Sequence, residues 1–196
     1  TARLSQRTHG TAQRHAEPIR AAIAADGLTE AEQKLSTLNT AFHHDGLFIR
    51  VPANTSERTP VRLVHVLVAS ARQALFPMTV IAVGAGSSVV LIDEYASIDP
   101  AGSAEPYLVN GRIELCLEPE ARVHYVRLQR WGAQAREFLL LRAILGRGAS
   151  LTLANLNLGS ALSKAHVVTK LAGEQASSRL YGFVFGHGRQ HVDQHT

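Results

Sequence analysis

The densest group of side chains that could bind a metal lies near the end of the sequence, in the run GHGRQHVDQHT. Its members are His187, His191, Asp193 and His195. A His-x-Asp pair on a strand places both side chains on one face, as in many facial metal triads. An extended strand, however, separates His191 from His195 by about 13 Å, whereas the ligands of one metal lie about 2 Å from it.

Two interpretations of this segment follow. The spacing favours a polar strand face, with no metal held by the isolated chain. The alternative is a metal-dependent, cupin-like or oxygenase-like β-barrel enzyme that uses His191 and Asp193. A third ligand, such as His124 or His166, would then have to come from elsewhere in the chain.

The remaining candidates for chemistry are isolated. Cys116 alternates with Arg112 and Glu114 in RIELCLE, so it belongs to the polar face of a strand. There it could carry sulfur, but no neighbour is expected to lower its pKa, which favours a structural role. Asp93 and Glu94 are adjacent and point to opposite faces, so they cannot act as a facing acid–base pair and are expected to be structural or solvated. The sequence therefore predicts no catalytic residue and no enzyme.

Composition indicates one globular domain. The 196 residues are 45% hydrophobic and 18% charged, which suffices for a buried core. The net charge of +4 is spread over single basic residues and aromatic residues make up 6%, so nucleic-acid binding is not expected. The single cysteine suits a reducing compartment, and we expect a cytoplasmic protein. No apolar run is long enough for a membrane span or a signal peptide.

The elements expected along the chain change in character after the first part. Residues 12–34 are rich in Ala, Glu, Gln and Arg and predict one or two short helices. Apolar runs rich in Val, Leu and Ile then predict strands near 61–69, 77–83, 88–95, 107–117, 122–129, 137–145, 150–157, 165–171 and 178–185. No helix-length pattern separates these strands, so we expect an all-β fold after a helical lead-in.

A repeat marks the turns between the strands. After each of Gly86, Glu120, Gly148 and Gln175 come a small residue and then a run in which apolar and polar residues alternate. These four positions lie 34, 28 and 27 residues apart. A period of 20 to 50 residues is typical of stacked units that bury their apolar faces against each other. The pattern favours a β-solenoid, and a β-sandwich remains the alternative.

Several stretches together resemble one family. These are LNTAFHHDGLFIRVP from Leu38, VLIDEY from Val90, ARVHYVRLQ from Ala121, LNLGSALS from Leu156 and GRQHVDQHT from Gly188. In this order and spacing they resemble the core domain of the SufB and SufD proteins of the SUF iron–sulfur cluster assembly system. The runs DGLFI-VP and RQHVD-HT are closer to SufD.

The resemblance implies a right-handed parallel β-helix over residues 35–196, after a helical lead-in over 1–34. It implies a scaffold subunit that acts with a sister SufB or SufD subunit and the SufC ATPase, with no cofactor bound by this chain alone and a cluster built transiently by the full complex. Gln129-Arg130-Trp131 resembles a Gln-x-Trp segment that lines an internal sulfur path in SufB-type members, so Gln129 and Trp131 are candidate path residues.

The two ends of the sequence suggest a piece of a longer protein. The sequence begins without methionine and stops at HVDQHT, within a predicted strand. The family's cluster-binding residues and ATPase-docking helices are expected beyond that point. Because an uncapped coil exposes strand edges and apolar interior, we expect the isolated chain to self-associate through its C-terminal coil.

Overall fold

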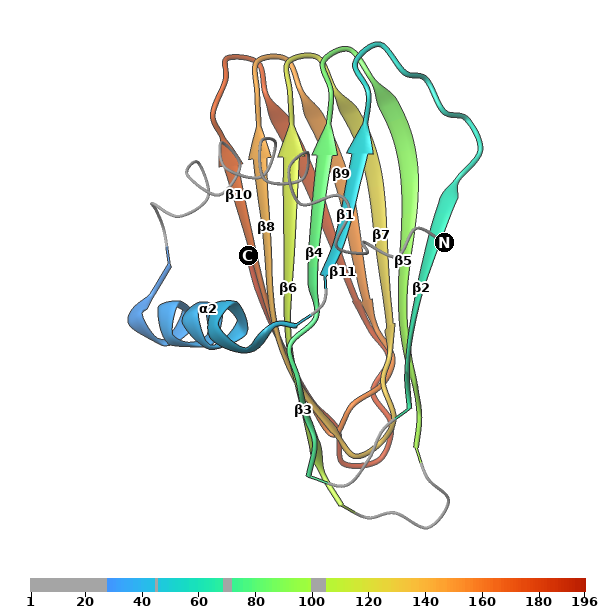
Figure 1. The fold of residues 1–196 in the computed structure, drawn as a ribbon, viewed down its shortest axis with the longest axis vertical. Helices are drawn as coiled ribbons and strands as arrows, with labels where there is room; N and C mark the ends of the chain where they lie inside the picture. Colours follow the sequence, from blue (N-terminus) through green and yellow to red (C-terminus); the bar gives the residue numbers. More distant parts are fainter. Residues whose placement is uncertain (1–27, 45, 69–71, 100–104) are drawn as a thin grey trace.

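Two sheets face each other along the length of the molecule (Figure 1). The structure is a computed structural model that describes residues 28–44, 46–68, 72–99 and 105–196. Sheet A contains β1 (Gly46–Val51), β4 (Met78–Val83), β6 (Tyr107–Leu117), β8 (Ala135–Leu145), β10 (Leu162–Leu171) and β12 (His191–His195), with the short β3 (Ala74–Leu75) also paired to β6. Sheet B contains β2 (Val61–Val68), β5 (Ser88–Ile98), β7 (Arg122–Arg130), β9 (Ser150–Asn157) and β11 (Ser177–Val184).

The chain runs alternately through the two sheets. Apart from the short β3, which precedes β4 in the same sheet, strands of sheet A and sheet B follow one another along the chain, and every strand pair among the described residues is parallel. This is a β-solenoid of about five turns, as predicted. The β-sandwich and the cupin-like barrel are both wrong, because their sheets are built largely from antiparallel strands.

The turns between the sheets repeat one backbone conformation. Asn54, Gly86, Glu120, Gly148 and Gln175 all have a positive φ, between 58° and 66°. The last four are the residues from which the repeat was predicted. The N–H of Gly86 donates to the carbonyl of Pro119 at 2.9 Å, and that of Glu120 donates to Arg147 at 2.8 Å, so each turn is bonded to the next coil. The sharp bend explains why small or turn-forming residues recur there.

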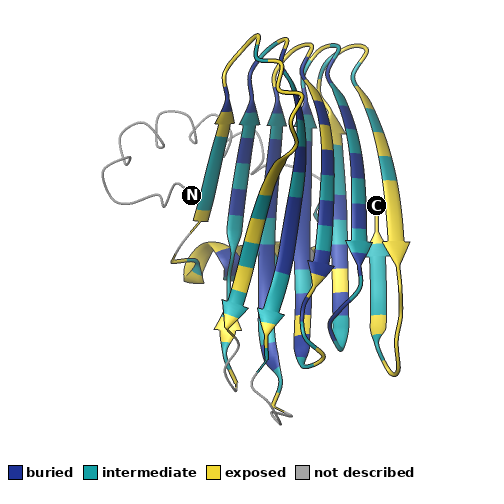
Figure 2. Ribbon diagram, turned by 90° about the vertical axis from the view of Figure 1, so that its right-hand side faces the viewer, coloured by how far each residue is buried: buried dark blue, intermediate teal, exposed yellow. Residues whose placement is uncertain are grey.

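The core lies between the sheets and has two halves. Inward side chains near these turns are aliphatic, with Val83, Leu117 and Leu145 from sheet A and Val89 and Val123 from sheet B. Nearer the opposite ends of the strands, many inward positions are polar. The two-residue alternation of the strands, seen as dark blue bands in Figure 2, thus buries both an apolar and a polar layer.

One helix, α2 (Glu30–Phe42), lies against the outer face of sheet A (Figure 1). The Asn39 amide donates to the carbonyl of Asn110 at 2.6 Å, and the Asn110 amide donates to the carbonyl of Leu35 at 2.9 Å. The helical prediction ended at residue 34, which is wrong, since the helix continues to Phe42. Residues 12–27 of that prediction lie outside the described residues. The predicted strands are all present with shifted ends, but β1 and the two-residue β3 were missed.

Candidate functional site: a polar cluster inside the solenoid

Neighbouring coils place polar side chains side by side in the interior. Arg127 on β7 is in register with Asp93 on β5 and with Asn155 on β9. Two residues further along, Gln129 is in register with Tyr95 and with Asn157. All six residues are buried, as are Glu137 of β8 and Ser163 of β10, which contribute to the cluster from sheet A. The solenoid thus stacks a polar layer through several coils.

Glu137 is the acceptor on which this cluster converges. Its carboxylate accepts a hydrogen bond from the Arg127 guanidinium, from the Trp131 indole N–H at 2.8 Å, from the Gln129 amide at 3.2 Å and from the Ser163 hydroxyl at 2.8 Å. Only 1% of the Glu137 side chain is exposed. A carboxylate this deep is tolerable because its charge is balanced by Arg127 and its oxygens are satisfied.

Arg127 connects the carboxylate to two asparagines and a ring. One of its terminal nitrogens donates to the side-chain oxygens of Asn155 at 3.1 Å and Asn157 at 3.2 Å. Its guanidinium carbon lies 5.0 Å from the centre of the Tyr95 ring, in a cation–π arrangement. These contacts fix the guanidinium, so the positive charge inside the solenoid has a defined position.

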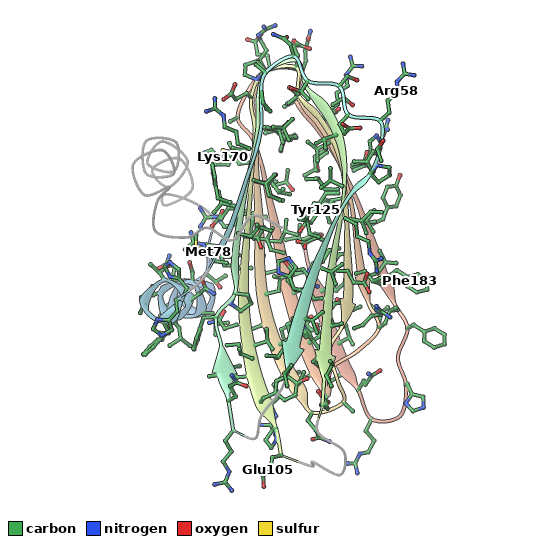
Figure 3. All side chains as sticks on the ribbon, turned by 45° about the vertical axis from the view of Figure 1, so that its right-hand side comes forward. Arg58, Met78, Glu105, Tyr125, Lys170 and Phe183 are labelled. Carbon is green, nitrogen blue, oxygen red and sulfur yellow. The ribbon has the colours of Figure 1, made fainter. Side chains whose placement is uncertain are left out.

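Asp93 forms a second centre next to the first. It accepts hydrogen bonds from the hydroxyls of Tyr95, at 2.8 Å, and Tyr125. Burial, and then the charge of Asp93, raise the pKa of both tyrosines, so both stay protonated and act as donors. In Figure 3, Tyr125 lies between the sheets.

His65 links this centre to the edge of sheet B. Its Nε2 lies 2.8 Å from Asp93, and its ring stacks on Tyr95 with 4.4 Å between ring centres. A quarter of the His65 side chain is exposed. The polar layer therefore reaches from a partly exposed imidazole to the buried Glu137.

A small cavity adjoins the cluster. It is lined by Tyr95, Gly111, Arg127, Trp131, Glu137 and Leu139, among others. Gly111 has no side chain at an inward position of β6, which leaves space opposite the charged pair. Cationic and neutral N–H donors thus border an internal space, an arrangement that can stabilise a small anionic or electron-rich group.

The comparisons with known proteins identify the family. Residues 65–196 match the family model described as SUF system FeS cluster assembly, SufBD core domain. The chain belongs to this family. Similar curated proteins are iron–sulfur cluster assembly SufBD family proteins of Synechocystis sp. (24% identical over 173 residues, 86% of this chain and 38% of that protein) and of Staphylococcus saprophyticus (26% identical over 155 residues, 79% of this chain and 32% of that protein). This SufBD chain therefore spans about a third of the length of these relatives. No solved structure matches it.

The two candidate path residues of this SufBD chain, Gln129 and Trp131, come together inside the solenoid. Both side chains are buried and both donate to Glu137. Sequence reasoning missed Arg127, Glu137 and the group around Asp93. One signal was present, because Arg127, Gln129 and Trp131 continue the inward alternation of β7 with polar groups where its first half has Val123 and Tyr125.

His191, Asp193 and His195 are outward residues of β12, at the end of sheet A, and His187 precedes that strand. Asp193 pairs with Lys164 at 3.3 Å and with His195 at 3.0 Å. Desolvation opposes ionisation of Asp193, but its hydrogen bonds with Lys164 and His195 and the charges of these two residues together outweigh it and lower its pKa. His124 is an outward residue of sheet B and so is remote from His191. Within the described ranges, no three His, Cys, Asp or Glu side chains are arranged to hold a metal ion.

Cys116 is on the polar outer face of β6, and Asp93 and Glu94 point to opposite faces of β5, as the alternation predicted. Burial, together with the charges of Glu114 and Glu118, raises the Cys116 pKa to about 11, so the thiol stays protonated. Glu94 is buried on the outer face of sheet B, where Arg62 and Arg130 pair with it. Asp93 and Glu94 were expected to be either structural or solvated. Both side chains are buried and paired, so they are structural and the expectation that they are solvated is wrong. No helix in the described part of the chain is both long and apolar enough to cross a membrane.

Proposed function

We propose that this chain is part of a scaffold subunit for iron–sulfur cluster assembly, on the SufD side of the family, and not an enzyme. In this proposal it acts in the cytoplasm with a sister SufB or SufD subunit and the SufC ATPase. The observation that carries the proposal is the match of residues 65–196 to the SufBD core domain, on a chain that folds as a parallel solenoid. The single cysteine agrees with a reducing compartment.

The iron–sulfur cluster is, in this proposal, cargo of the full complex and not a resident cofactor of this chain. Cys116 is a poor ligand as it stands, because its raised pKa disfavours the thiolate that binds iron. We therefore assign no cluster ligand to this chain.

The interior polar cluster is proposed to guide sulfur. Gln129 and Trp131 resemble the path residues of SufB-type relatives, and here both donate to a carboxylate beside an internal cavity. The neighbouring Arg127 supplies a fixed positive charge, and N–H donors can hold an anionic sulfur species by charge-assisted hydrogen bonds. In this role Glu137 keeps the donors oriented until sulfur replaces it as their acceptor.

The proposal is tested in the full-length protein, expressed with its SufC and sister subunits. We expect the three proteins to purify together, and Gln129→Leu and Trp131→Phe to lower the incorporation of labelled sulfide sulfur into the cluster several-fold. Trp131→Phe replaces the indole by a smaller aromatic ring and removes the N–H donor. Gln33→Leu, on the exposed side of α2, is the matched control. Loss of the complex in the wild type would refute the scaffold role, and unchanged sulfur incorporation in both variants would refute the path.

Self-association of the isolated polypeptide 1–196 is a separate part of the proposal. β11 is the last strand of sheet B, and Phe183, Val184 and Phe185 at its end are exposed large hydrophobic residues. Unpaired strand edges next to apolar side chains recruit further strands. Sedimentation velocity over a concentration series should show dimers or larger species, and a polypeptide that stays monomeric at high concentration would contradict this part.

A further inference from the structure

The outer face of sheet B is apolar over several strands. We call the outward residues of β2, β5, β7, β9 and β11 the sheet B face. Its large exposed hydrophobic residues are Val64, Val66, Val68, Ile98, Tyr181, Phe183 and, just beyond β11, Phe185, each between 51% and 70% exposed. Between them lie further apolar outward residues, such as Ile92, Val126 and Leu156. In Figure 3, Phe183 points away from the solenoid. An exposed apolar surface of this extent marks an interaction site.

The corresponding face of sheet A is built differently. Its outward residues include Asn110, Arg112, Glu114 and Arg142, and α2 lies against it (Figure 1). α2, the helix that the structure describes, therefore leaves the sheet B face uncovered. The outer face of sheet A also shows how a short helix can pack on this solenoid.

The charges on the sheet B face are almost all positive. Its outward charged residues on the five strands are Arg62, Arg122, Arg130 and Arg179, against the single carboxylate of Glu94. Glu94 is 3% exposed and holds two of the arginines, with its Oε2 3.0 Å from the Nε of Arg62 and its Oε1 paired with Arg130. The face is thus apolar with a net positive charge, which favours an acidic partner.

The two arginines on Glu94 keep donors available for a partner. Each guanidinium carries five N–H groups, more than one shared carboxylate can accept. The Arg62 side chain is 61% exposed and that of Arg130 is 51% exposed, so their free N–H groups face solvent. A second carboxylate can be bound there by the paired, charge-assisted geometry that arginine favours.

We propose that the sheet B face binds an amphipathic α-helix of a partner protein, whose apolar stripe is flanked by Asp or Glu residues. Five strands at about 4.8 Å spacing span about 19 Å, the length of a helix of about 13 residues. The apolar stripe of the partner helix packs on Leu128, Leu156 and Phe183, which are in register across β7, β9 and β11. An acidic residue of the partner helix binds Arg62 or Arg130. A second copy of this chain fits poorly, because face-to-face stacking would bring the arginines of both copies together.

The experiment measures binding of a fluorescent synthetic peptide to the full-length protein by anisotropy. The peptide has leucines at i, i+3, i+4 and i+7 flanked by glutamates, and it is cross-linked to stay helical because short helices are marginal alone. We expect it to bind at least tenfold more tightly than the same peptide with lysines in place of the glutamates. Val66→Ser and the pair Arg62→Gln with Arg179→Gln should each weaken binding about tenfold. Arg136→Gln, an exposed arginine on the outer face of sheet A, should not.

These variants are expected to fold, because the replaced side chains are exposed and Arg130 still pairs with Glu94; circular dichroism checks this. Equal binding of the two peptides, or no effect of Val66→Ser, overturns the proposal. Self-association of the wild type that Val66→Ser abolishes would assign the face to a second copy, and anionic vesicles that bind wild type but not Val66→Ser would assign it to a membrane. A cysteine introduced by Val66→Cys that resists alkylation in the full-length protein would show that the face is already covered. Each of these outcomes also overturns the proposal, and none bears on cluster assembly.

Discussion

The exchange Glu137→Gln keeps the size of the side chain and removes its charge, so it isolates what the carboxylate does inside the solenoid. The side chain has four donors, from Arg127, Gln129, Trp131 and Ser163, and all of them are buried. After the exchange, the hydrogen-bond acceptors of the buried Arg127 guanidinium are all neutral, and its direct ion pair is lost. Breaking a buried ion pair from one side costs about 3–5 kcal/mol, and we expect a loss of that size in the free energy of unfolding.

Native-state amide exchange in β7 and β8 measures this loss, because it reports the opening of these strands separately from the rest of the protein. The double variant Arg127→Met with Glu137→Leu removes both charges, so it should cost less than the sum of its two single exchanges. Arg147→Gln, which breaks an exposed pair with Glu120, is the control and should cost about 1 kcal/mol or less. A cost below about 1 kcal/mol for Glu137→Gln, or additive costs in the double variant, would refute the assignment of Glu137 as the centre of the cluster.

Three further predictions follow from local geometry. Gly173→Ala should destabilise the protein by about 1–3 kcal/mol in thermal unfolding, because the new Cβ would lie 2.1 Å from a backbone nitrogen of the preceding coil. Gly186→Ala is the control and should be nearly neutral, because no atom lies within 4 Å of its new Cβ. Equal effects would be inconsistent with the tight stacking of the turns. Alkylation of Cys116 by iodoacetamide should be slow near neutral pH and accelerate as the pH approaches about 11; fast labelling at pH 7 would mean that the thiol is not shielded as described. Asp193→Asn should speed amide exchange in β12 at pH 7, because it removes the charge that pairs with Lys164. Since the pKa of Asp193 is lowered in the folded protein, this pair stabilises the fold fully above the ordinary aspartate pKa of about 3.9. The stabilisation is lost as the pH falls through the lowered pKa. Exchange as slow as in the wild type would show that this pair does not hold the strand.

The strands and the kind of turn that joins them could be predicted from the sequence. Both depend on local preferences: alternation of apolar and polar residues selects a strand, and a sharp bend selects small residues at each turn. The four positions that revealed the repeat, from Gly86 to Gln175, all have a positive φ. The same alternation correctly placed Cys116 on the polar face of its strand, and Asp93 and Glu94 on opposite faces.

Which inward residues meet depends on contacts between coils that are far apart in the sequence. Arg127 and Glu137 come from opposite sheets, and His65, Asp93 and Tyr125 come from three successive coils. The coils differ in length, since the repeated turn positions lie 34, 28 and 27 residues apart, so the sequence does not reveal the register that joins these residues across the interior. The helix boundary at Phe42 was hidden for a similar reason, because α2 is held against β6 by the hydrogen bonds of the Asn39 and Asn110 amides, which join residues far apart in the sequence. Long-range contacts set the polar cluster, whereas short-range preferences set the fold that carries it.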